Sequence, residues 1–475
     1  MAKYQGILKS AILQECTSDN TGILINSLRD MNNSAMTKFI KLFSLLLLLS
    51  LSMCAQVKKH ILQYTTPVKS AEFSDTCWDD LKPLAESIGE KRIVMLGEQF
   101  HGDGEAMKLK SRIVRFLHQQ MGFKVLLFES DYFSLNHGYD AFKNGRISFD
   151  SLLYLSVFSI WTGCQQMDEL FQYIKESTTT GNELIINGMD NRGISGYGFR
   201  YLQPAIESFL RSARIPFVKA SEYPYFLSVL RQSATLIFGK NKAAIDSMVQ
   251  LLPIVIDQVS ERPVARDHLN SSFYLNVLNG LLINYQLSLH YFYGNEYKLH
   301  RKDHPLHDYQ LAENLQWLVT KKFPADKIIV WAHNEHIEKG EMRPHQSSGY
   351  NSMGYLFTRK PGMLRQSYIL GATCYEGSGK MVGHPEATKT TRPSRNSIEA
   401  WLHGTGNQYA FSDLSHLNRI DSSARFIMRT YFNTESNQEW TKYYDGILYN
   451  NFAHPCIEKA RNKLNGQQLS GQDPE

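Results

Sequence analysis

Short apolar runs alternate with longer amphipathic segments over most of the chain, after a polar stretch from about residue 56 to 91. Short runs rich in β-branched residues have the length of buried strands, whereas apolar residues at helical spacing indicate helices that bury one face. This alternation predicts an α/β fold, in which a sheet core with parallel strands is flanked by helices. The predicted strands are Arg92–Leu96, Lys124–Phe128, Leu184–Asn187, Lys327–Trp331, Ser367–Thr373 and Gly446–Tyr449.

The amphipathic segments give the predicted helices. Glu105–Gln120 has mostly helical apolar spacing and is followed by Gly122, a residue type that commonly ends helices. Further helices are predicted around Phe149–Ser177 and at Tyr309–Lys322. The stretch from Tyr201 to Leu289 is rich in Leu, Ile and Tyr and is largely helical in pattern, so we interpret about residues 201–300 as a helical insertion or cap over the active-site cleft.

The N-terminal residues have the pattern of an export signal. Lys38 and Lys41 precede an apolar run over residues 42–51, which is too short to span a bilayer comfortably, and small residues follow it. We therefore expect residues 1–55 to form an N-terminal extension with a signal peptide. The protein would be exported, periplasmic or secreted, with no stable membrane span after cleavage.

Two details of this region stay open. About 35 polar residues are long for the leading region of a signal, so Met36 is an alternative start to Met1. Cys54 stands where a lipid-modified cysteine could, but Met53 is a poor match for the small residue expected before it. Simple cleavage near Ala55 is therefore preferred over lipid anchoring.

Composition fits one large domain after the signal. With 475 residues and 43% hydrophobic content the chain can bury a sizeable core, and we predict a catalytic domain over residues 56–465 and a disordered tail over 466–475. The 51 basic and 46 acidic residues form no basic stripe interleaved with aromatics, so nucleic acid is not an expected partner. Setting aside Cys16 and Cys54 leaves too few cysteines for a disulfide scaffold, and no CxxC pair indicates a zinc knuckle.

Acidic residues and histidines follow each of the first four predicted strands. In open α/β sheets, ligands bind beyond the carboxyl ends of the strands, so side chains at these positions converge although they are distant in sequence. They are Glu98, His101 and Glu105 after the first strand, Glu129 after the second, Asp190 after the third, and His333, Asn334 and His336 after the fourth. This convergence predicts an active centre.

His101 is the leading candidate for a general base. It lies in a loop with three glycines, and its unperturbed pKa near 6.5 suits proton transfer from water. A carboxylate from Glu98, Glu129 or Glu105 would hold the other ring nitrogen and stabilise the imidazolium. Structural explanations compete for Glu105, which would stabilise a helix's first turn, and for Asp190, which would serve as a turn or cap residue.

Missing motifs narrow the mechanism. The chain has no Gly-x-Ser-x-Gly elbow, no His-Glu-x-x-His helix and no Gly-x-x-x-x-Gly-Lys loop. Water activated by His101 is therefore the simplest hydrolytic scheme. His333-Asn334-Glu335-His336 would then polarise a carbonyl or stabilise the developing oxyanion.

These motifs resemble the erythromycin esterase family in order and spacing. The matching segments are Leu96-Gly97-Glu98, His101-Gly102 with Glu105, Phe128-Glu129, and Val330-Trp331-Ala332-His333-Asn334 with His336, within a looser match from about Leu84 to Tyr449. The resemblance implies a metal-independent hydrolase without cofactor that opens the lactone of macrolide antibiotics, and with it possible macrolide resistance. It also implies that water is activated at His101, that Glu98, Glu129, His333 and His336 line the centre, and that a helical section closes the cleft.

Two residues depart from the family pattern. Relatives usually have Arg-Asp where this chain has His307-Asp308, and often Ser or Thr where it has Asp103. A negative charge at Asp103, beside the expected base, could raise the pKa of that base or alter substrate choice.

Two other functions stay open from the residues alone. A divalent metal could be held by nitrogen and oxygen donors of the same cluster, giving a metal-dependent hydrolase that uses Glu98, His101, Glu105, Glu129, His333 and His336. A non-catalytic protein could bind a polyketide, haem-like or sugar ligand there. Five or six ionisable groups exceed what affinity alone needs, which favours a hydrolase with a small-molecule ester or lactone substrate.

Overall fold

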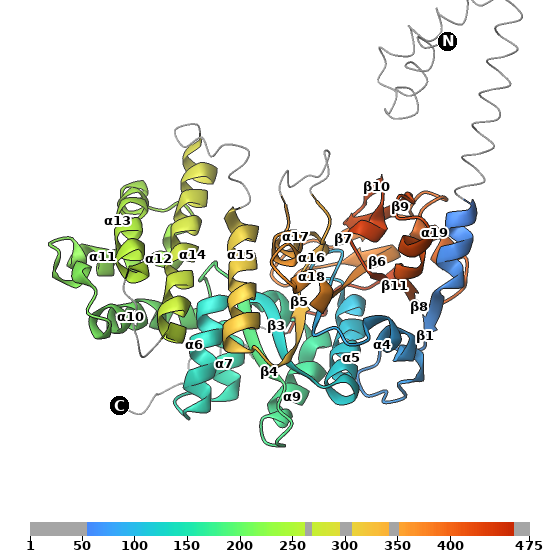
Figure 1. Ribbon diagram of the computed structural model, residues 1–475, viewed down its shortest axis with the longest axis horizontal. Helices are drawn as coiled ribbons and strands as arrows, with labels where there is room; N and C mark the ends of the chain where they lie inside the picture. Colours follow the sequence, from blue (N-terminus) through green and yellow to red (C-terminus); the bar gives the residue numbers. More distant parts are fainter. Residues whose placement is uncertain (1–54, 262–267, 295–305, 342–350, 460–475) are drawn as a thin grey trace, which may run out of the picture. The chain divides into compact units, whose positions relative to one another are not determined.

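The computed structural model describes residues 55–261, 268–294, 306–341 and 351–459 (Figure 1). The chain divides into two compact units, Met1–Lys59 and His60–Glu475. Nearly all of the first unit, with the expected signal peptide, Met36 and Cys54, lies outside the described residues, as does the expected tail at 466–475. The fold below is that of the second unit.

A nine-stranded mixed sheet forms the core, in the order β1-β8-β11-β6-β2-β5-β3-β4 with β7 paired to β6. Its bounds are β1 Thr65–Val68, β2 Ile93–Leu96, β3 Phe123–Asp131, β4 Ile185–Asp190, β5 Lys327–Trp331, β6 Ser367–Gly379, β7 Thr388–Thr390, β8 Tyr409–Asp413 and β11 Gly446–Ala453. The six strands from β11 to β4 are parallel, while β1, β7 and β8 run antiparallel to the strands beside them. The predicted parallel core is confirmed.

The central strands are buried on both faces, as their almost uninterrupted apolar sequences require. All four residues of β2 are buried, and its last residue, Leu96, is level with Trp331 of β5. Trp331 is in turn level with Phe128 of β3. β2 and β5 therefore end level with Phe128 of β3, and the polar residues that follow Leu96, Phe128 and Trp331 begin side by side.

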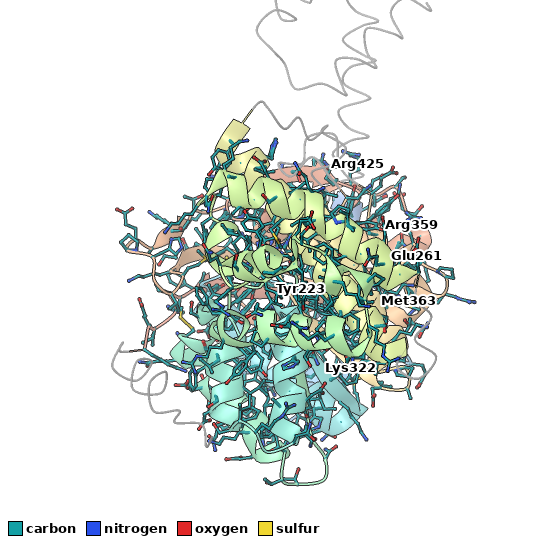
Figure 2. The ribbon with its side chains drawn as sticks, turned by 90° about the vertical axis from the view of Figure 1, so that its left-hand side faces the viewer. Tyr223, Glu261, Lys322, Arg359, Met363 and Arg425 are labelled. Atoms are coloured by element: carbon teal, nitrogen blue, oxygen red, sulfur yellow. A yellow bond between two sulfur atoms is a disulfide. The ribbon has the colours of Figure 1, made fainter. Side chains whose placement is uncertain are left out.

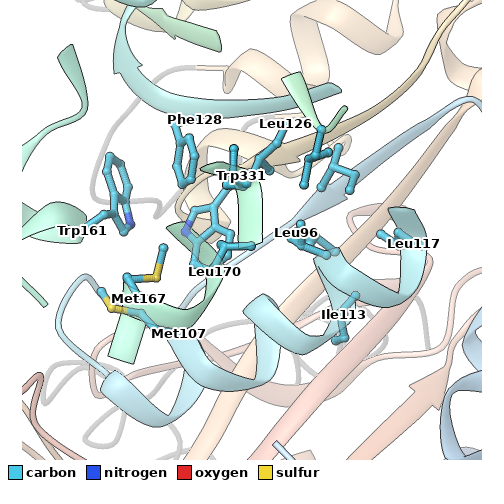
Figure 3. Close-up of a cluster of buried hydrophobic side chains, with 14 of the residues drawn as sticks. Leu96, Met107, Ile113, Leu117, Leu126, Phe128, Trp161, Met167, Leu170 and Trp331 are labelled. Atoms are coloured by element: carbon cyan, nitrogen blue, oxygen red, sulfur yellow. The ribbon is translucent and has the colours of Figure 1, made fainter. Parts of the chain in front are cut away.

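Helices between the strands cover the sheet. Asp103 caps the N-terminus of α5, and Gly122 ends that helix at φ 71°, a conformation that favours glycine. The bounds are α4 Lys82–Ile88, α5 Gly104–Met121, α6 Tyr132–Lys143, α7 Phe149–Ser156, α8 Ser159–Thr162, α9 Asp168–Ser177, α15 Leu306–Trp317, α16 Asn334–Ile337, α17 Met353–Thr358, α18 Met363–Gln366, α19 Ile398–His403 and α20 Ser415–Ile420. Figure 3 shows Ile113 of α5 and Leu170 of α9 in one buried cluster with Trp331 of β5.

The predicted insertion corresponds to a helical section beside the β4 edge of the sheet (Figures 1 and 2). It comprises α10 Gly196–Ser212, α11 Tyr223–Leu230, α12 Ser233–Leu236, α13 Lys242–Ser260 and α14 His268–Tyr293. It packs on α6 and α7 through α10, and on α15 through α14. Among the described residues, α13 alone is long and apolar enough for a membrane span, which is weak evidence because a core helix passes the same test.

Asparagine side chains at one edge of the sheet and a proline at the other hinder pairing with a further strand. At the β4 edge, Asn136 of α6 donates a hydrogen bond to the carbonyl of Gly188 at 3.4 Å, and Asn314 of α15 donates one to Met189 at 2.9 Å. At the other edge, β1 has four residues and contains Pro67, which has no N–H to offer. Both edge strands are thus poorly suited to pairing with a further strand.

Several features were not predicted. The strands β1, β7 and β8 and the hairpin of β9 Phe426–Tyr431 with β10 Thr434–Gln438 are short or polar, so they lack a clear apolar run. Cys164 and Cys456 form a disulfide between residues 292 positions apart, with their Cα atoms 5.6 Å apart. Sequence spacing alone gave no sign of this pair.

Candidate active site

The carboxyl ends of four parallel strands bring the predicted site residues together. Glu98 follows β2, Glu129 lies near the end of β3, Asp190 is the last residue of β4, and His333 follows β5. All four side chains are buried. Their charges and hydrogen bonds are therefore weakly screened by water.

His101 lies in the loop after β2 and contacts two of these acids. Its Nδ1 is 2.5 Å from Oε1 of Glu98, and its Nε2 is 3.8 Å from Oε1 of Glu129. The loop needs Gly102, because φ there is 118° and a Cβ would come within 2.6 Å of the Lys380 backbone. The His101 side chain remains 22% exposed, so a small molecule can reach it.

Glu98 is held as a carboxylate by a buried cation. Its Oε2 accepts hydrogen bonds from Nζ of Lys110 at 3.1 Å and from Nε1 of Trp331 at 3.2 Å. Lys110 lies 4.1 Å above the Trp331 ring, and burial lowers its pKa to about 8. Burial alone would raise the pKa of Glu98, but Lys110 and His101 outweigh it and lower that pKa to about 2. Glu98 in turn helps to raise the pKa of His101 against the effect of burial.

Glu129 lies within 4 Å of nitrogen atoms from four residues. Its Oε2 accepts the backbone N–H of His333 at 2.8 Å. Its Oε1 lies 3.3 Å from Nε2 of His336, 3.8 Å from Nε2 of His101 and 3.9 Å from Nη2 of Arg192. Burial is again outweighed, here chiefly by His336, so the pKa of Glu129 lies well below its usual value.

His336 is an imidazolium held between two carboxylates. Its Nδ1 is 2.6 Å from Oδ1 of Asp308 in α15, and its Nε2 faces Glu129. These two acids overcome burial and place the pKa of His336 well above its ordinary value. The other oxygen of Asp308 accepts the backbone N–H of Met353 at 3.1 Å, which fixes the carboxylate in place.

His333 differs from His101 and His336, because both of its ring nitrogens bond to backbone groups and not to carboxylates. Its Nδ1 accepts the N–H of Glu335 at 3.2 Å, and its Nε2 lies 2.9 Å from the carbonyl oxygen of Gln99, to which it donates. This pattern requires the neutral ring, and burial with nearby His101 lowers its pKa to about 3. The ring links the β5 end to the β2 loop, and its backbone links both to Glu129.

Asp190 orients the half-exposed Arg192. The Asp190 carboxylate accepts the backbone N–H of Arg192 at 2.7 Å and its Nε at 2.9 Å. The guanidinium faces Glu129, and its Nη1 has no hydrogen-bond partner among the described residues. His307, at the start of α15, lies with its Nε2 3.7 Å from Oδ2 of Asp190.

Two predicted residues point elsewhere. The buried side-chain amide of Asn334 forms hydrogen bonds of 2.7 to 3.0 Å with the backbone of Ala372 and Thr430. It therefore links the end of β5 to β6 and β9. Glu105 accepts a hydrogen bond from Tyr409 of β8. The backbone N–H of Asn334 donates to the carbonyl of Glu98 at 2.9 Å. Among the described residues, neither the Asn334 nor the Glu105 side chain bonds to the side chains of Glu98, His101 or Glu129.

Asp103 does not act as a second charge on His101. It caps α5 by accepting the N–H groups of Glu105 and Ala106, and it also accepts Asn450 of β11 at 3.0 Å. Burial raises its pKa to about 7 despite these bonds. The expected effect on the base therefore has no contact to support it.

Sequence reasoning missed Lys110, Trp331, Arg192 and Asp308. Lys110 could have been recognised from the sequence, because it lies in the apolar stripe of α5 between Met107 and Val114. A lysine at such a position is buried and needs a charged or hydrogen-bonding partner. Arg192 and Asp308 stand next to recognised residues but carry no pattern of their own.

Fold and site together define an α/β protein with a buried histidine and carboxylate centre at the carboxyl ends of its parallel strands. The chain belongs to the erythromycin esterase family, whose family model matches residues 118–451. That match includes Glu129, Asp190, His333 and His336, and it begins after His101. The family name and those of relatives indicate a hydrolase of the esterase type.

Relatives and solved structures span most of the chain. The Bacillus subtilis protein YbfO, whose name calls it a hydrolase, is 27% identical over 80% of this chain and 87% of its own. Erythromycin esterase type II of Escherichia coli is 23% identical over 71% and 84%, respectively. A Bacillus cereus protein of known structure has a TM-score of 0.65 at 18% identity, covering 86% of this chain and 99% of its own. A mutant erythromycin esterase in its open conformation has a TM-score of 0.60 at 15% identity, covering 83% and 98%. These structures confirm the fold.

Proposed function

We propose that this protein hydrolyses carboxylic esters or lactones with a water molecule that His101 activates. The observation that carries the proposal is the 2.5 Å contact between Nδ1 of His101 and the buried Glu98 carboxylate. It fixes the proton on Nδ1 and leaves the lone pair of Nε2 free to act as a base. The family membership and the names of the relatives support a hydrolase.

The proton moves between water and the substrate through His101. Nε2 takes a proton from water while the water oxygen forms a bond to the carbonyl carbon. Glu98 stabilises the resulting imidazolium from one side and Glu129 from the other, at 3.8 Å. His101 then returns the proton to the departing alkoxide as the carbon–oxygen bond breaks, so a lactone gains one water and opens to a hydroxy acid.

Arg192 and His336 supply positive charge for the developing oxyanion. Arg192 is 45% exposed, and its Nη1 has no hydrogen-bond partner in the described part of the chain. The guanidinium of Arg192 and the ring of His336 both lie within 4 Å of the same oxygen of Glu129. A preoriented cation in a site partly shielded from water stabilises such a charge strongly. His333, which we expected in this role, has no ring nitrogen left for it, and we assign it to positioning Glu129 and the loop of Gln99.

Macrolide lactones are the first substrates to test, because two relatives are named erythromycin esterases. Macrolide resistance would follow if the protein opens them. We also propose that the protein is exported, periplasmic or secreted. The Cys164–Cys456 disulfide supports this, since such bonds persist in oxidising compartments.

Metal-free water activation is favoured over the metal-dependent alternative by the same contacts. The six residues considered as ligands do not share one centre: Glu105 is bonded to Tyr409, and both ring nitrogens of His333 are used. The remaining alternative is a protein that binds its ligand without catalysing a reaction.

The test is to incubate the purified protein with erythromycin, with and without a chelator, and to follow a gain of one water by mass spectrometry. We expect chelator-resistant opening that falls by about 10² to 10⁴ in His101→Asn. The matched control is His137→Asn, a half-buried histidine that contacts Tyr197 at 2.9 Å outside the site. Opening that survives in His101→Asn would overturn the mechanism. Binding without opening of erythromycin or simple aryl esters would favour the binding protein.

A further inference from the structure

We infer that His307, Asp308 and His336 form a binding site for a divalent transition metal ion of the zinc class, beside the water-activating histidine. One donor atom from each of the three residues lies within 4.8 Å of the other two. Two imidazoles and one carboxylate are a common set of protein ligands for such ions. Small side-chain movements would bring the three atoms to bonding distance.

His307 offers a donor that has no other use. Its Nε2 is buried and has no hydrogen-bond partner among the described residues. The nearest charged atom is Oδ2 of Asp190, at 3.7 Å, which is beyond hydrogen-bond distance. A buried nitrogen without a partner is costly, and a bound ion would satisfy it.

The surrounding groups already hold the other two ligands. Metal-binding histidines usually give their second ring nitrogen to a carboxylate, and Nε2 of His336 faces Glu129 at 3.3 Å. Asp308 is fixed by the N–H of Met353 at 3.1 Å. Nδ1 of His336 and Oδ1 of Asp308, 2.6 Å apart, share a proton that the metal ion would replace, with release of that proton to solvent.

The charge of the centre also suits a dication. With the shared proton of His336 removed, four carboxylates face two cationic side chains, which leaves two uncompensated negative charges. The groups are Glu98, Glu129, Asp190 and Asp308 against Lys110 and Arg192. Nitrogen donors select zinc, cobalt, nickel or copper over magnesium and calcium.

This site is separate from water activation, because Nδ1 of His101 is bound to Glu98 and is not among the three ligands. The metal ion would sit at Nδ1 of His336, while Nε2 of the same ring and Nε2 of His101 both face Oε1 of Glu129, at 3.3 Å and 3.8 Å. Hydrolysis by the proposed mechanism therefore continues in chelator, and metal binding can be measured without any substrate.

The experiment titrates the chelator-treated full chain with Co²⁺, followed by its visible absorption, and with Zn²⁺ by calorimetry, with Mg²⁺ as the control ion. We expect one Zn²⁺ or Co²⁺ per chain, no response to Mg²⁺, and at least about a tenfold loss of affinity in His307→Ala and Asp308→Asn. The matched control His137→Ala should bind as the wild type does.

A wild-type chain that takes up no Co²⁺ or Zn²⁺ would overturn the proposal, as would His307→Ala binding with unchanged affinity. Circular dichroism without metal shows which variants are folded. Zn²⁺ must also raise the wild-type melting temperature, since it binds the native state, and must not raise that of His307→Ala. Loss of erythromycin opening in His101→Asn is scored separately, so failure of one proposal leaves the other intact.

Discussion

Replacing Glu98 by glutamine tests the electrostatic arrangement of the site without any substrate. Glutamine keeps the size of the side chain but removes the charge that pairs with Lys110 at 3.1 Å and with His101 at 2.5 Å. Lys110 is then left as a buried ammonium group without a carboxylate partner. We expect the folded state to lose stability.

The magnitude follows from the pKa of Glu98, which is about 2 in the folded protein against 4.5 for an unperturbed glutamate. At about 1.4 kcal/mol per unit, the charged form stabilises the fold by about 3 kcal/mol at pH 7. This agrees with the roughly 3–5 kcal/mol that breaking a buried ion pair costs. For a unit of about 400 residues, it corresponds to a melting temperature lower by about 4 °C.

The sign of the pH dependence is fixed by the same shift. A depressed carboxyl pKa adds stability above pH 4.5 that is lost as the pH falls toward 2, so the difference between wild type and variant should shrink to about half by pH 3. The assay is thermal unfolding between pH 3 and 7. The control Glu72→Gln breaks the exposed 3.3 Å pair with Lys108 and should cost less than about 1 kcal/mol.

A Glu98→Gln variant no less stable than Glu72→Gln at pH 7 would refute this reasoning, and so would a deficit that stays constant down to pH 3. The variant should also shift the acid limb of the pH–rate profile of hydrolysis. Glu98 raises the pKa of His101, and the base works only when deprotonated, so its loss should move that limb to lower pH.

Other parts of the structure give three more predictions. Arg192→Gln should lower kcat by about 10² to 10³ with little change in melting temperature, measured on erythromycin or on a simple ester that the wild type hydrolyses. An unchanged kcat would contradict the oxyanion role. Asn334→Ala should lower the free energy of unfolding by about 2–4 kcal/mol, because the buried amide of Asn334 bonds the backbone of Ala372. The kcat of the folded variant should stay near the wild-type value. Reduction of Cys164–Cys456 should lower stability by about 2–5 kcal/mol, seen by thermal unfolding with and without reductant; peptide mapping that finds both thiols free would contradict the pairing.

Most of the central sheet could be predicted from the sequence, because its strands are short and apolar on both faces. β5 has the predicted bounds, Lys327–Trp331. β3 extends to Asp131 and β4 to Asp190, beyond the predicted ends, since polar residues continue the strands after each apolar run stops. The apolar residues of a sequence therefore indicate which part of a strand is buried, whereas hydrogen bonding to the neighbouring strand determines where the strand ends.

The site was only partly predictable for a related reason. Parallel neighbours place Glu98, Glu129 and His333 together, and that proximity follows from strand order alone. Sequence does not fix which way a loop side chain turns, so Asn334 faces the backbone of β6 and Glu105 faces Tyr409.

The protected edges of the sheet limit how this protein can associate or aggregate. At one edge, asparagine amides from α6 and α15 occupy carbonyls of β4, and at the other Pro67 interrupts a four-residue strand. These features disfavour growth by strand addition, the usual start of cross-β aggregation, at β4 and at β1. At these two edges, association between copies would rest on side-chain contacts, and its strength would therefore depend on surface residues.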